Sequence, residues 1–469
     1  MVKLSTKDEK FREQVLSGPI LSTIWKVCIP LAVFQTLSNL FNILDTLMAS
    51  HISSEAVSTV VYFVQINHIV SSIGGGLAVG GSILISRRYG AGYYEEVKRL
   101  LSTLVAIAAI IGAIVLAMIP FVPAILRGAG TPETFVTLGS TYFSIILFAA
   151  VINFFNVIYI SIERARGNSK AILRLNILII LIKLTLTAIF VYVFNGGIIM
   201  IATATLISYL VLFTIAIKNL TKNDDAFSFS YKYITFKKNI WLPILKLSLP
   251  SMAEKIAFSY GKAIVNTMAA DYGTNAVGAS GISNNMSGLL TGIQMGFQDG
   301  GTSLEGQIHG AGKLDRAVKF YRRIILIQSI IGVLGIILYQ FLMAPIAKIF
   351  SMTKGGYDPV FQQMIVDIFT FEILGCLVLS LSYAAMTVIL GMGKTKLVLL
   401  INFCRLFVFR VPIMYFLTNF TDIGYRSVGI TVALSNTAVG IMSFIIAESV
   451  IAGERKKQRQ NIVLESQHD

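Results

Sequence analysis

The sequence predicts an all-α polytopic membrane protein with twelve transmembrane helices, arranged in two six-helix lobes that are related by an internal repeat. Hydrophobic residues make up 55% of the 469-residue chain and charged residues 13%, and the mean hydropathy is +0.74, whereas soluble domains have about 25% charged residues. Twelve apolar stretches recur along the chain, and its two halves share one motif. Together these observations favour a duplicated membrane bundle over a soluble fold.

Each apolar stretch has the roughly 20 residues that cross a bilayer at about 1.5 Å per residue. The first six lie near residues 20–48, 55–85, 100–123, 135–160, 171–194 and 197–217. The second six lie near residues 242–270, 277–306, 320–346, 360–390, 397–418 and 428–450. Because the number of spans is even, both termini are expected on one side of the membrane.

The longest hydrophilic stretch inside the chain separates the two sets of spans. We therefore divide the chain into an N-terminal lobe (1–218), an inter-lobe linker (219–240), a C-terminal lobe (241–452) and a solvated tail (453–469). The first span exceeds the roughly 7–15 apolar residues of a signal-peptide core, so we expect it to stay attached.

Basic residues predict the orientation, because Lys and Arg near membrane ends are retained in the cytoplasm. With the N-terminus inside, 29 of the 39 basic residues fall in cytoplasmic segments and 4 in outer loops. The termini, linker and tail are therefore expected in the cytoplasm. The formal net charge of +15 is explained by this topology and by anionic lipid headgroups, so it does not indicate a nucleic-acid partner.

The two halves match at an offset of 220 residues. Pro30 corresponds to Pro250, and Gly76, Gly80, Gly81, Gly90 and Gly92 correspond to Gly296, Gly300, Gly301, Gly310 and Gly312. The GxxxG spacings within these sets let helix backbones approach closely. In apolar proteins, two such halves usually face each other across a central cavity and rock around a site between them.

Motifs of enzymes and metal sites do not occur in the sequence. It contains no HExxH pair, no GxSxG elbow and no phosphate-binding loop. The three cysteines, Cys28, Cys376 and Cys404, lie in apolar spans without CxxC spacing. We therefore expect neither an enzyme nor a bound metal.

Five short motifs carry a resemblance to a known family: Asp45-Thr-Leu-Met-Ala, Leu249-Pro-Ser-Met-Ala-Glu254, Asp271-Tyr-Gly-Thr-Asn, Glu305-Gly-Gln-Ile-His-Gly and Leu390-Gly-Met-Gly-Lys. In this order, and with the duplication, the chain resembles the multidrug and toxic compound extrusion (MATE) transporters, most closely the DinF-like bacterial branch of the MOP flippase superfamily. The resemblance covers nearly the whole chain. It implies a V-shaped helical exporter with a central cavity, driven by proton or sodium entry.

Asp45 lies deep in the first span, with Asn42 three residues before it on the same helical face. A carboxylate inside a membrane costs several kcal/mol unless it is partnered, neutralised or faces water, so a functional role is the default hypothesis. The resemblance implies that Asp45 is the centre of an N-lobe cation or proton site. The alternative is an Asp that bonds to neighbouring polar groups of its own helix.

The resemblance also implies a sodium site that adds an Asn on span 4, an Asn and an Asp four residues apart on span 5, and a Thr on span 6. The candidates are Asn153, Asn156, Asn176, Thr203 and Thr205. The span 5 Asp is missing, because Ile180 stands four residues after Asn176. The loss of a hard oxygen ligand disfavours sodium, so protons are the expected coupling ion and sodium is the alternative.

Lys183 lies seven residues after Asn176, on about the same helical face. In one interpretation its ammonium pairs with Asp45, and the two groups titrate together as the coupling event. In the other, the apolar stem of Lys183 lets the charge reach the outer membrane interface. The sequence leaves both open.

In the second half, Glu254, Lys255 and Lys262 form a mixed-charge stripe on span 7 that cannot face lipid. We expect it to line the substrate cavity or its cytoplasmic mouth. Gln294 and Asp299 of span 8 are further polar candidates for the substrate cavity. Because Asp299 lies within a GxxxG stretch, bonding across a close helix contact is the favoured interpretation for it.

Span 11 carries two further basic residues, Arg405 and Arg410, shortly before Pro412. Asp367 and Glu372 of span 10 are the candidate partners of these guanidinium groups.

These observations predict a secondary antiporter that exports small amphipathic organic compounds by alternating access, coupled to proton or, less favourably, sodium entry. The protein is expected to be located in the bacterial plasma membrane. An anionic or lipid-linked cargo is the alternative, because the cavity candidates include bases as well as acids. A receptor or channel is disfavoured, since the sequence shows no extramembrane domain and no selectivity-filter segment. Without coiled-coil heptads, a monomer is expected.

Overall fold

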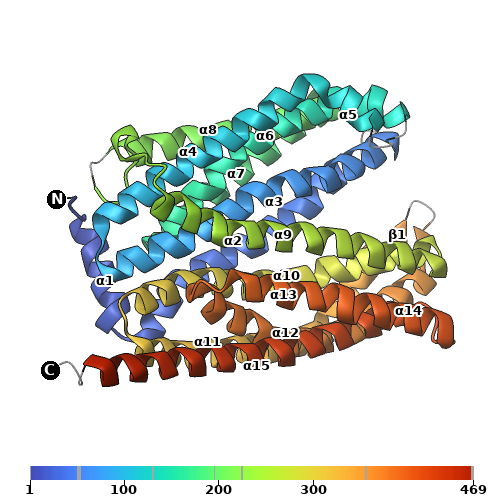
Figure 1. Ribbon diagram of the computed structural model, residues 1–469. Coiled ribbons are helices and arrows are strands. Elements are labelled where there is room, and N and C mark those ends of the chain that lie inside the picture. Colours follow the sequence, from blue (N-terminus) through green and yellow to red (C-terminus); the bar gives the residue numbers. More distant parts are fainter. Residues whose placement is uncertain are drawn as a thin grey trace. The chain divides into compact units, whose positions relative to one another are not determined.

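The computed structural model describes residues 2–49, 54–128, 131, 133–194, 196–222, 225–353 and 356–465, and helices make up nearly all of them (Figure 1). The helices of the first half are α1 (Thr6–Ser17), α2 (Ile20–Ala49), α3 (Ser54–Ala91), α4 (Tyr94–Met118), α5 (Val122–Gly128), α6 (Glu133–Ala165), α7 (Ser169–Ala188) and α8 (Ile198–Lys222). Those of the second half are α9 (Lys238–Ala269), α10 (Thr274–Gly310), α11 (Leu314–Phe350), α12 (Pro359–Gly391), α13 (Thr395–Phe403), α14 (Val411–Phe420) and α15 (Arg426–Glu465).

Short elements interrupt or join these helices. Three are single 3₁₀ turns: η1 (Ile119–Phe121), η3 (Tyr231–Tyr233) and η4 (Ala270–Tyr272). Two are π-helical segments, η2 (Ile189–Val193) and η5 (Cys404–Arg410). A two-residue hairpin, β1 (Met352–Thr353) and β2 (Gly356–Tyr357), pairs antiparallel between α11 and α12.

The twelve predicted spans are confirmed as helical segments. Among the described residues, ten helical stretches are long and apolar enough to cross a membrane. The remaining two predicted spans are α9 and α10, which have 32 and 37 residues but a more polar composition. Polar residues inside a spanning helix normally face the bundle interior or water, so these two helices are where polar side chains concentrate.

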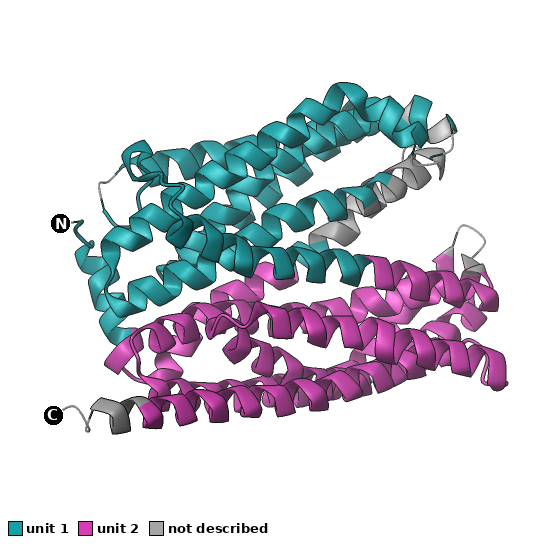
Figure 2. Cartoon of the chain, viewed as in Figure 1, with its two compact units in different colours: residues 1–14, 37–259 teal, residues 15–36, 260–469 magenta. Residues whose placement is uncertain are grey.

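The chain forms two compact units (Figure 2). Unit 1 comprises residues 1–14 and 37–259, and unit 2 comprises residues 15–36 and 260–469. The first part of α2 thus packs with the second half of the chain, and the first part of α9 packs with the first half. The lobe boundaries at 218 and 241 remain a prediction from the sequence.

In unit 1, the GxxxG glycines of α3 pack against the first part of α9. A Cβ atom built on Gly76 would lie 2.8 Å from the backbone nitrogen of Met252, and one on Gly80 would lie 2.7 Å from that of Ser248. Such distances leave no room for a side chain. The two helices therefore touch backbone to backbone, as the small-residue spacing predicts.

Unit 2 contains the equivalent contact between α10 and the first part of α2. A Cβ atom on Gly296 would lie 2.3 Å from the Cα of Ala32, and one on Gly300 would lie 2.8 Å from the Sγ of Cys28. The offset of 220 residues relates all four of these positions to their counterparts in unit 1. Each unit therefore contains the same close helix pair, built from opposite halves of the chain.

The predicted linker packs into unit 1 rather than remaining fully solvated. Asp225, Phe227 and Ser228 are buried. The ring of Phe227 meets that of Tyr89 edge to face, with centroids 5.0 Å apart, and the backbone N–H of Ser230 donates to the Ser102 hydroxyl at 3.2 Å. The hydrophilic stretch is thus partly a structural element of the first unit.

The predicted tail continues α15 as helix to Glu465, and residues 455–460 are exposed.

Candidate functional site

The centre of the predicted ion-coupling site is only partly described. Asn42 and Asp45 lie in α2, but their side chains fall outside the described residues. The role of Asp45, and its pairing with Lys183, therefore stay predictions. Lys183 itself is half-buried on α7.

The other predicted coupling residues of unit 1 bond mainly to helix backbone. Asn156 is buried on α6 and donates to the carbonyl of Tyr209 on α8 at 3.0 Å. Asn176 and Thr203 donate to carbonyls of their own helices at 2.8 and 2.9 Å, as polar residues in helices commonly do. Asn153 is half-buried on α6. None of these three hydrogen bonds joins two residues of the set.

One side-chain oxygen among the predicted coupling residues has an unused capacity to accept a hydrogen bond. The Oδ1 atom of Asn156 is buried, and no described residue donates a hydrogen bond to it. Such an atom is costly to leave unpaired.

The mixed-charge stripe of α9 is divided between the two units. Glu254 and Lys255 belong to unit 1 and are half-buried, and the stem of Lys255 passes beside Gly75 of α3. Lys262 belongs to unit 2 and is exposed. The role of all three in a substrate cavity remains a prediction.

The two polar residues predicted on α10 behave differently. Asp299 accepts a hydrogen bond from Gln35 of α2 at 3.2 Å, beside the close contact of these helices. This confirms the expected bonding across a helix contact. Gln294 is fully buried, and its side-chain amide has no hydrogen-bond partner among the described residues, whereas its backbone carbonyl accepts from Gln328 at 2.9 Å.

The two arginines of span 11 meet on a residue that sequence reasoning did not single out. The Nη2 atoms of Arg405 and Arg410 both donate to Oδ1 of Asn436 on α15, at 2.8 and 2.9 Å. Arg405 also donates to this oxygen through Nε at 3.2 Å, and Arg410 donates through Nε to Ser435 at 3.0 Å. Two guanidinium groups therefore share one neutral acceptor.

A local change of helix type brings these arginines together. In an α-helix, residues five apart point about 140° away from each other, because each residue turns by about 100°. Arg405 and Arg410 lie in the π-helical segment η5, whose i→i+5 bonding brings such residues near one face. Apolar periodicity carries no signal for this segment.

The predicted acidic partners of the arginines bond elsewhere. Asp367 forms an ion pair with Arg426 at 2.8 Å and accepts from the Tyr425 hydroxyl at 2.8 Å. Glu372 is buried on α12 and accepts hydrogen bonds from Ser283 and, at 2.6 Å, from Ser287 of α10. The contacts described for these two carboxylates thus lead to other residues, while the Glu372 charge acts on Arg410 through space. Their pairing with Arg405 or Arg410 stays a prediction.

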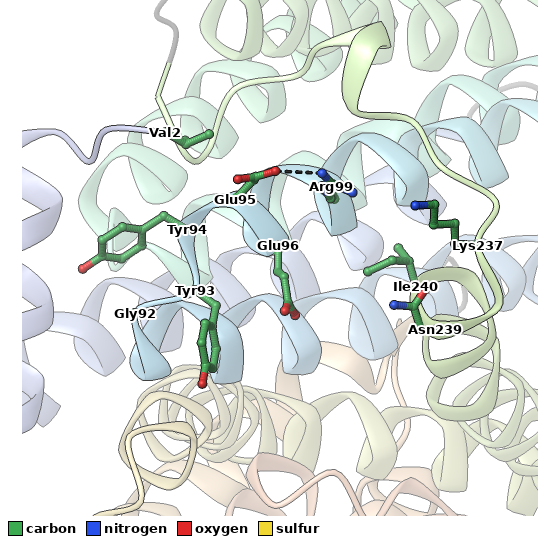
Figure 3. Close-up of a pocket in the computed structure, with 10 residues that line it drawn as sticks. All are labelled: Val2, Gly92, Tyr93, Tyr94, Glu95, Glu96, Arg99, Lys237, Asn239 and Ile240. Carbon is green, nitrogen blue, oxygen red and sulfur yellow. Dashed lines mark hydrogen bonds and ion pairs between the residues drawn. The ribbon is translucent and has the colours of Figure 1, made fainter.

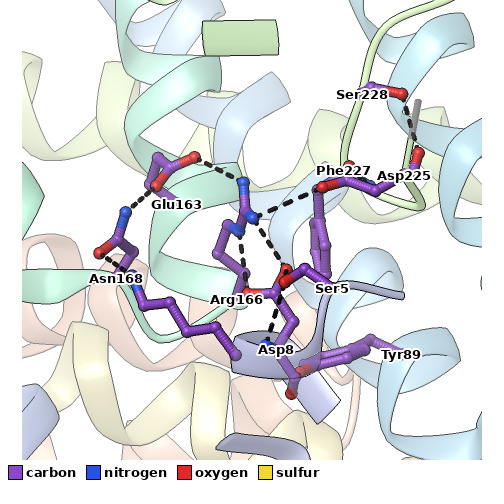
Figure 4. A network of polar contacts seen from close by, with 10 residues as sticks. Ser5, Asp8, Tyr89, Glu163, Arg166, Asn168, Asp225, Phe227 and Ser228 are labelled. Carbon is purple, nitrogen blue, oxygen red and sulfur yellow. Dashed lines mark hydrogen bonds and ion pairs between the residues drawn. The ribbon is translucent and has the colours of Figure 1, made fainter. Parts of the chain in front are cut away.

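A second polar network lies in unit 1, where α1 meets the loops that follow α6 and α8 (Figure 4). Arg166 forms ion pairs with Asp8 at 2.8 Å, Glu163 at 3.3 Å and Asp225 at 3.7 Å. Asp8 is only 2% exposed. Its backbone carbonyl also accepts from the Tyr89 hydroxyl. One guanidinium thus balances three carboxylates and holds α1 and the linker against α6.

The network makes a pH-dependent contribution to stability through Asp225. Burial raises the pKa of Asp225, and Arg166 opposes that rise. An acid whose pKa is higher in the folded state stabilises the fold while protonated, and this contribution is lost as the pH rises through the folded-state pKa. Stability from this group is therefore expected to fall from acid towards neutral pH.

Substituting Asp225→Asn should remove this dependence while retaining an acceptor for the backbone N–H of Phe227, which Asp225 binds at 2.9 Å. We expect the Tm difference, variant minus wild type, to become more positive between about pH 4 and pH 7. Thermal unfolding of the purified protein across this range measures it. A difference that is constant with pH would contradict the assignment.

A surface pocket lies in unit 1 beside the turn between α3 and α4 and the start of α9 (Figure 3). Its lining includes Tyr93, Glu96 and Lys237, and the one ion pair drawn there joins Glu95 to Arg99 at 2.7 Å. It contains none of the predicted site residues. The exposed Glu95–Arg99 pair contributes little to stability.

Comparisons with known proteins point to one family. Residues 30–189 and 250–416 match the model of the family described as MatE. The chain is 26% identical over 353 residues to the probable multidrug resistance protein YoeA of Bacillus subtilis (strain 168), covering 72% of this chain and 75% of that protein. It is 23% identical over 472 residues to an FAD transporter of Shewanella oneidensis, covering 94% and 97%.

The fold matches a solved crystal structure of MATE in complex with MaL6. The TM-score is 0.90 at 22% sequence identity, over 94% of this chain and 99% of that chain.

Proposed function

Because the chain belongs to the MATE family of multi-pass membrane transporters, we propose that it is a secondary antiporter that exports small amphipathic organic compounds and takes up protons in exchange. The likeness to the probable multidrug resistance protein supports export of such compounds. We further propose that the protein acts as a monomer in the bacterial plasma membrane, with both termini in the cytoplasm.

The ligand chemistry of unit 1 favours protons over sodium. A hard cation needs several oxygen ligands, with carboxylates among them. Ile180 occupies the position where the sodium-binding pattern has an Asp. Asn156, Asn176 and Thr203 donate hydrogen bonds to backbone carbonyls, and none of them supplies a carboxylate.

Asp45→Asn is expected to abolish proton-driven efflux, because an amide cannot take up and release a proton in the pH range of a carboxyl group. Efflux of a fluorescent cationic dye from proteoliposomes, under an imposed proton gradient or an imposed sodium gradient, measures the coupling. Asp315→Asn, which removes an exposed carboxylate at the start of α11, is the matched control. Full proton-driven efflux by Asp45→Asn would remove this residue from the mechanism.

A second candidate function is export or flipping of an anionic or lipid-linked cargo by the same fold. The basic cluster around Arg405 and Arg410 in unit 2 favours it, as does the likeness to an FAD transporter over 94% of the chain. If the cationic dye moves under neither gradient but an anionic dye does move, this candidate is favoured over the first.

A further inference from the structure

We propose that Glu305 of α10 is a second proton-carrying residue of the transport cycle, which holds a proton while it is buried in unit 2 and exchanges it with water when α10 and α12 separate. The inference rests on the proposed proton-coupled antiport and deepens it, because it adds a protonation site in unit 2 to the one predicted at Asp45.

The carboxyl group of Glu305 is buried without a partner. Its side chain is 0% exposed, and neither of its two buried oxygens has a hydrogen-bond partner among the described residues. An ionised carboxylate in such a place would bear the full cost of its lost hydration, so burial favours the neutral acid. Glu305 therefore holds a proton in this conformation.

No charge of a described residue acts on the Glu305 carboxyl group. The helices that pack with α10 are the first part of α2, α11 and α12. Their titratable residues include Lys26 of α2, Tyr321 of α11 and Lys394, which follows α12 and pairs with Glu454 at 3.3 Å, and α10 itself adds His309. None of them supplies a charge that would keep Glu305 ionised.

The internal repeat indicates that packing does not require a carboxyl group at this position. The offset of 220 residues relates Glu305 to Ile85 of α3, which is also 0% exposed. A Cβ atom on Gly391 would lie 2.5 Å from Cγ of Glu305, so the stem of Glu305 packs directly on the end of α12. An acid thus stands at a packing position that the first half of the chain fills with an apolar residue.

Unpaired polar atoms continue from Glu305 along α10. Thr302, Gln298 and Gln294 precede it by three, seven and eleven residues, which places all four on one helical face. The hydroxyl of Thr302, Oε1 of Gln298 and the side-chain amide of Gln294 are buried and have no hydrogen-bond partner among the described residues. Water that enters beside α10 would satisfy these groups. The O–H bond of Glu305 then breaks, its proton passes to water, and the carboxylate is left solvated.

Infrared spectroscopy of the purified protein in detergent at neutral pH tests for the bound proton without any transport. The carbonyl stretch of a protonated carboxyl group is separate from that of a carboxylate. We expect a protonated-acid band in wild type that is lost in Glu305→Gln. The matched control Glu95→Gln, which changes an exposed carboxylate paired with Arg99 at 2.7 Å, should retain the band. Identical spectra of wild type and Glu305→Gln in this region would overturn the proposal.

Glu305→Met separates a proton-carrying role from a structural one, and it decides the outcome even where Glu305→Gln fails to fold. Replacing an unpartnered buried polar group by an apolar one of similar shape removes a desolvation penalty. The Tm of this variant should therefore be at least that of wild type, while the protonated-acid band is lost. A clear loss of Tm would show that the carboxyl group stabilises the fold through its contacts, which contradicts the proposal.

The effect on coupling is measured in proteoliposomes that contain a pH indicator and a fluorescent dye as substrate. In Glu305→Gln, the number of protons exchanged per dye molecule should fall by about half, because one of two proton-carrying carboxyl groups is missing. An unchanged ratio would overturn the inference. Wild type that shows the infrared band without proton-driven efflux contradicts the proposed function, whereas proton-driven efflux in wild type without the band contradicts only the role of Glu305.

Discussion

Replacing Arg166 with glutamine is expected to destabilise unit 1 by about 3 kcal/mol, because removing one partner of a buried ion pair leaves uncompensated charge. Asp8 and Glu163 are 2% and 3% exposed, and both lose their cation in this variant. The third carboxylate, Asp225, loses its more distant ion pair as well. Three acidic groups would then repel one another within the fold.

Thermal unfolding of purified Arg166→Gln in detergent measures this effect, and part of the lost Tm should return at acid pH as the carboxylates become protonated. Arg88→Gln is the matched control. Arg88 pairs with Glu96 at 3.0 Å, but the two side chains are 46% and 40% exposed, and exposed pairs contribute about 0–1 kcal/mol. Equal Tm losses in the two variants would show that burial of the network does not matter.

Replacing Gly296 with alanine is expected to produce a loss of similar size, about 3 kcal/mol, through overpacking. The new methyl group would lie 2.3 Å from both the backbone nitrogen and the Cα of Ala32. Backbone atoms cannot move away by changing rotamer, so α10 and the first part of α2 would have to separate. The readout is the Tm of purified protein together with its yield in monodisperse form.

Gly281→Ala on the same helix is the control. A Cβ atom on Gly281 has no described atom within 4 Å, and alanine favours helix over glycine by about 1 kcal/mol. This variant should therefore be as stable as wild type or slightly more stable. If Gly296→Ala and Gly281→Ala unfold at the same temperature, the close backbone contact between α10 and the first part of α2 is disproved.

The helical architecture could be predicted from the sequence because it depends on local features, namely the length and composition of each apolar stretch. Span length and apolar composition are set by the bilayer, so each predicted span is found as a helical segment, some of them interrupted by 3₁₀ or π-helical turns. The repeated GxxxG spacing also predicted close helix contacts, since only residues without a side chain permit them. The missing carboxylate at Ile180 was likewise visible in the sequence, because it needs only a comparison of residue types.

Contacts between distant residues could not be read in this way. Asn436 is one of many polar residues in the sequence, and it becomes notable only when Arg405 and Arg410 meet on it. Their meeting depends on a π-helical segment, which leaves no mark on apolar periodicity. Glu372, a predicted partner of these arginines, accepts hydrogen bonds from Ser283 and Ser287 of α10. The packing of α10 on α12 places these hydroxyl groups beside it.

By itself, the sequence determined that this protein is a duplicated helical membrane protein with twelve spans, since composition and spacing act residue by residue along the chain. Only the tertiary structure decided which helices pack together. The first part of α2 joins unit 2 and the first part of α9 joins unit 1. The two halves present equivalent glycine surfaces, so the sequence pattern is the same whichever half supplies the partner helix, and only three-dimensional packing distinguishes them.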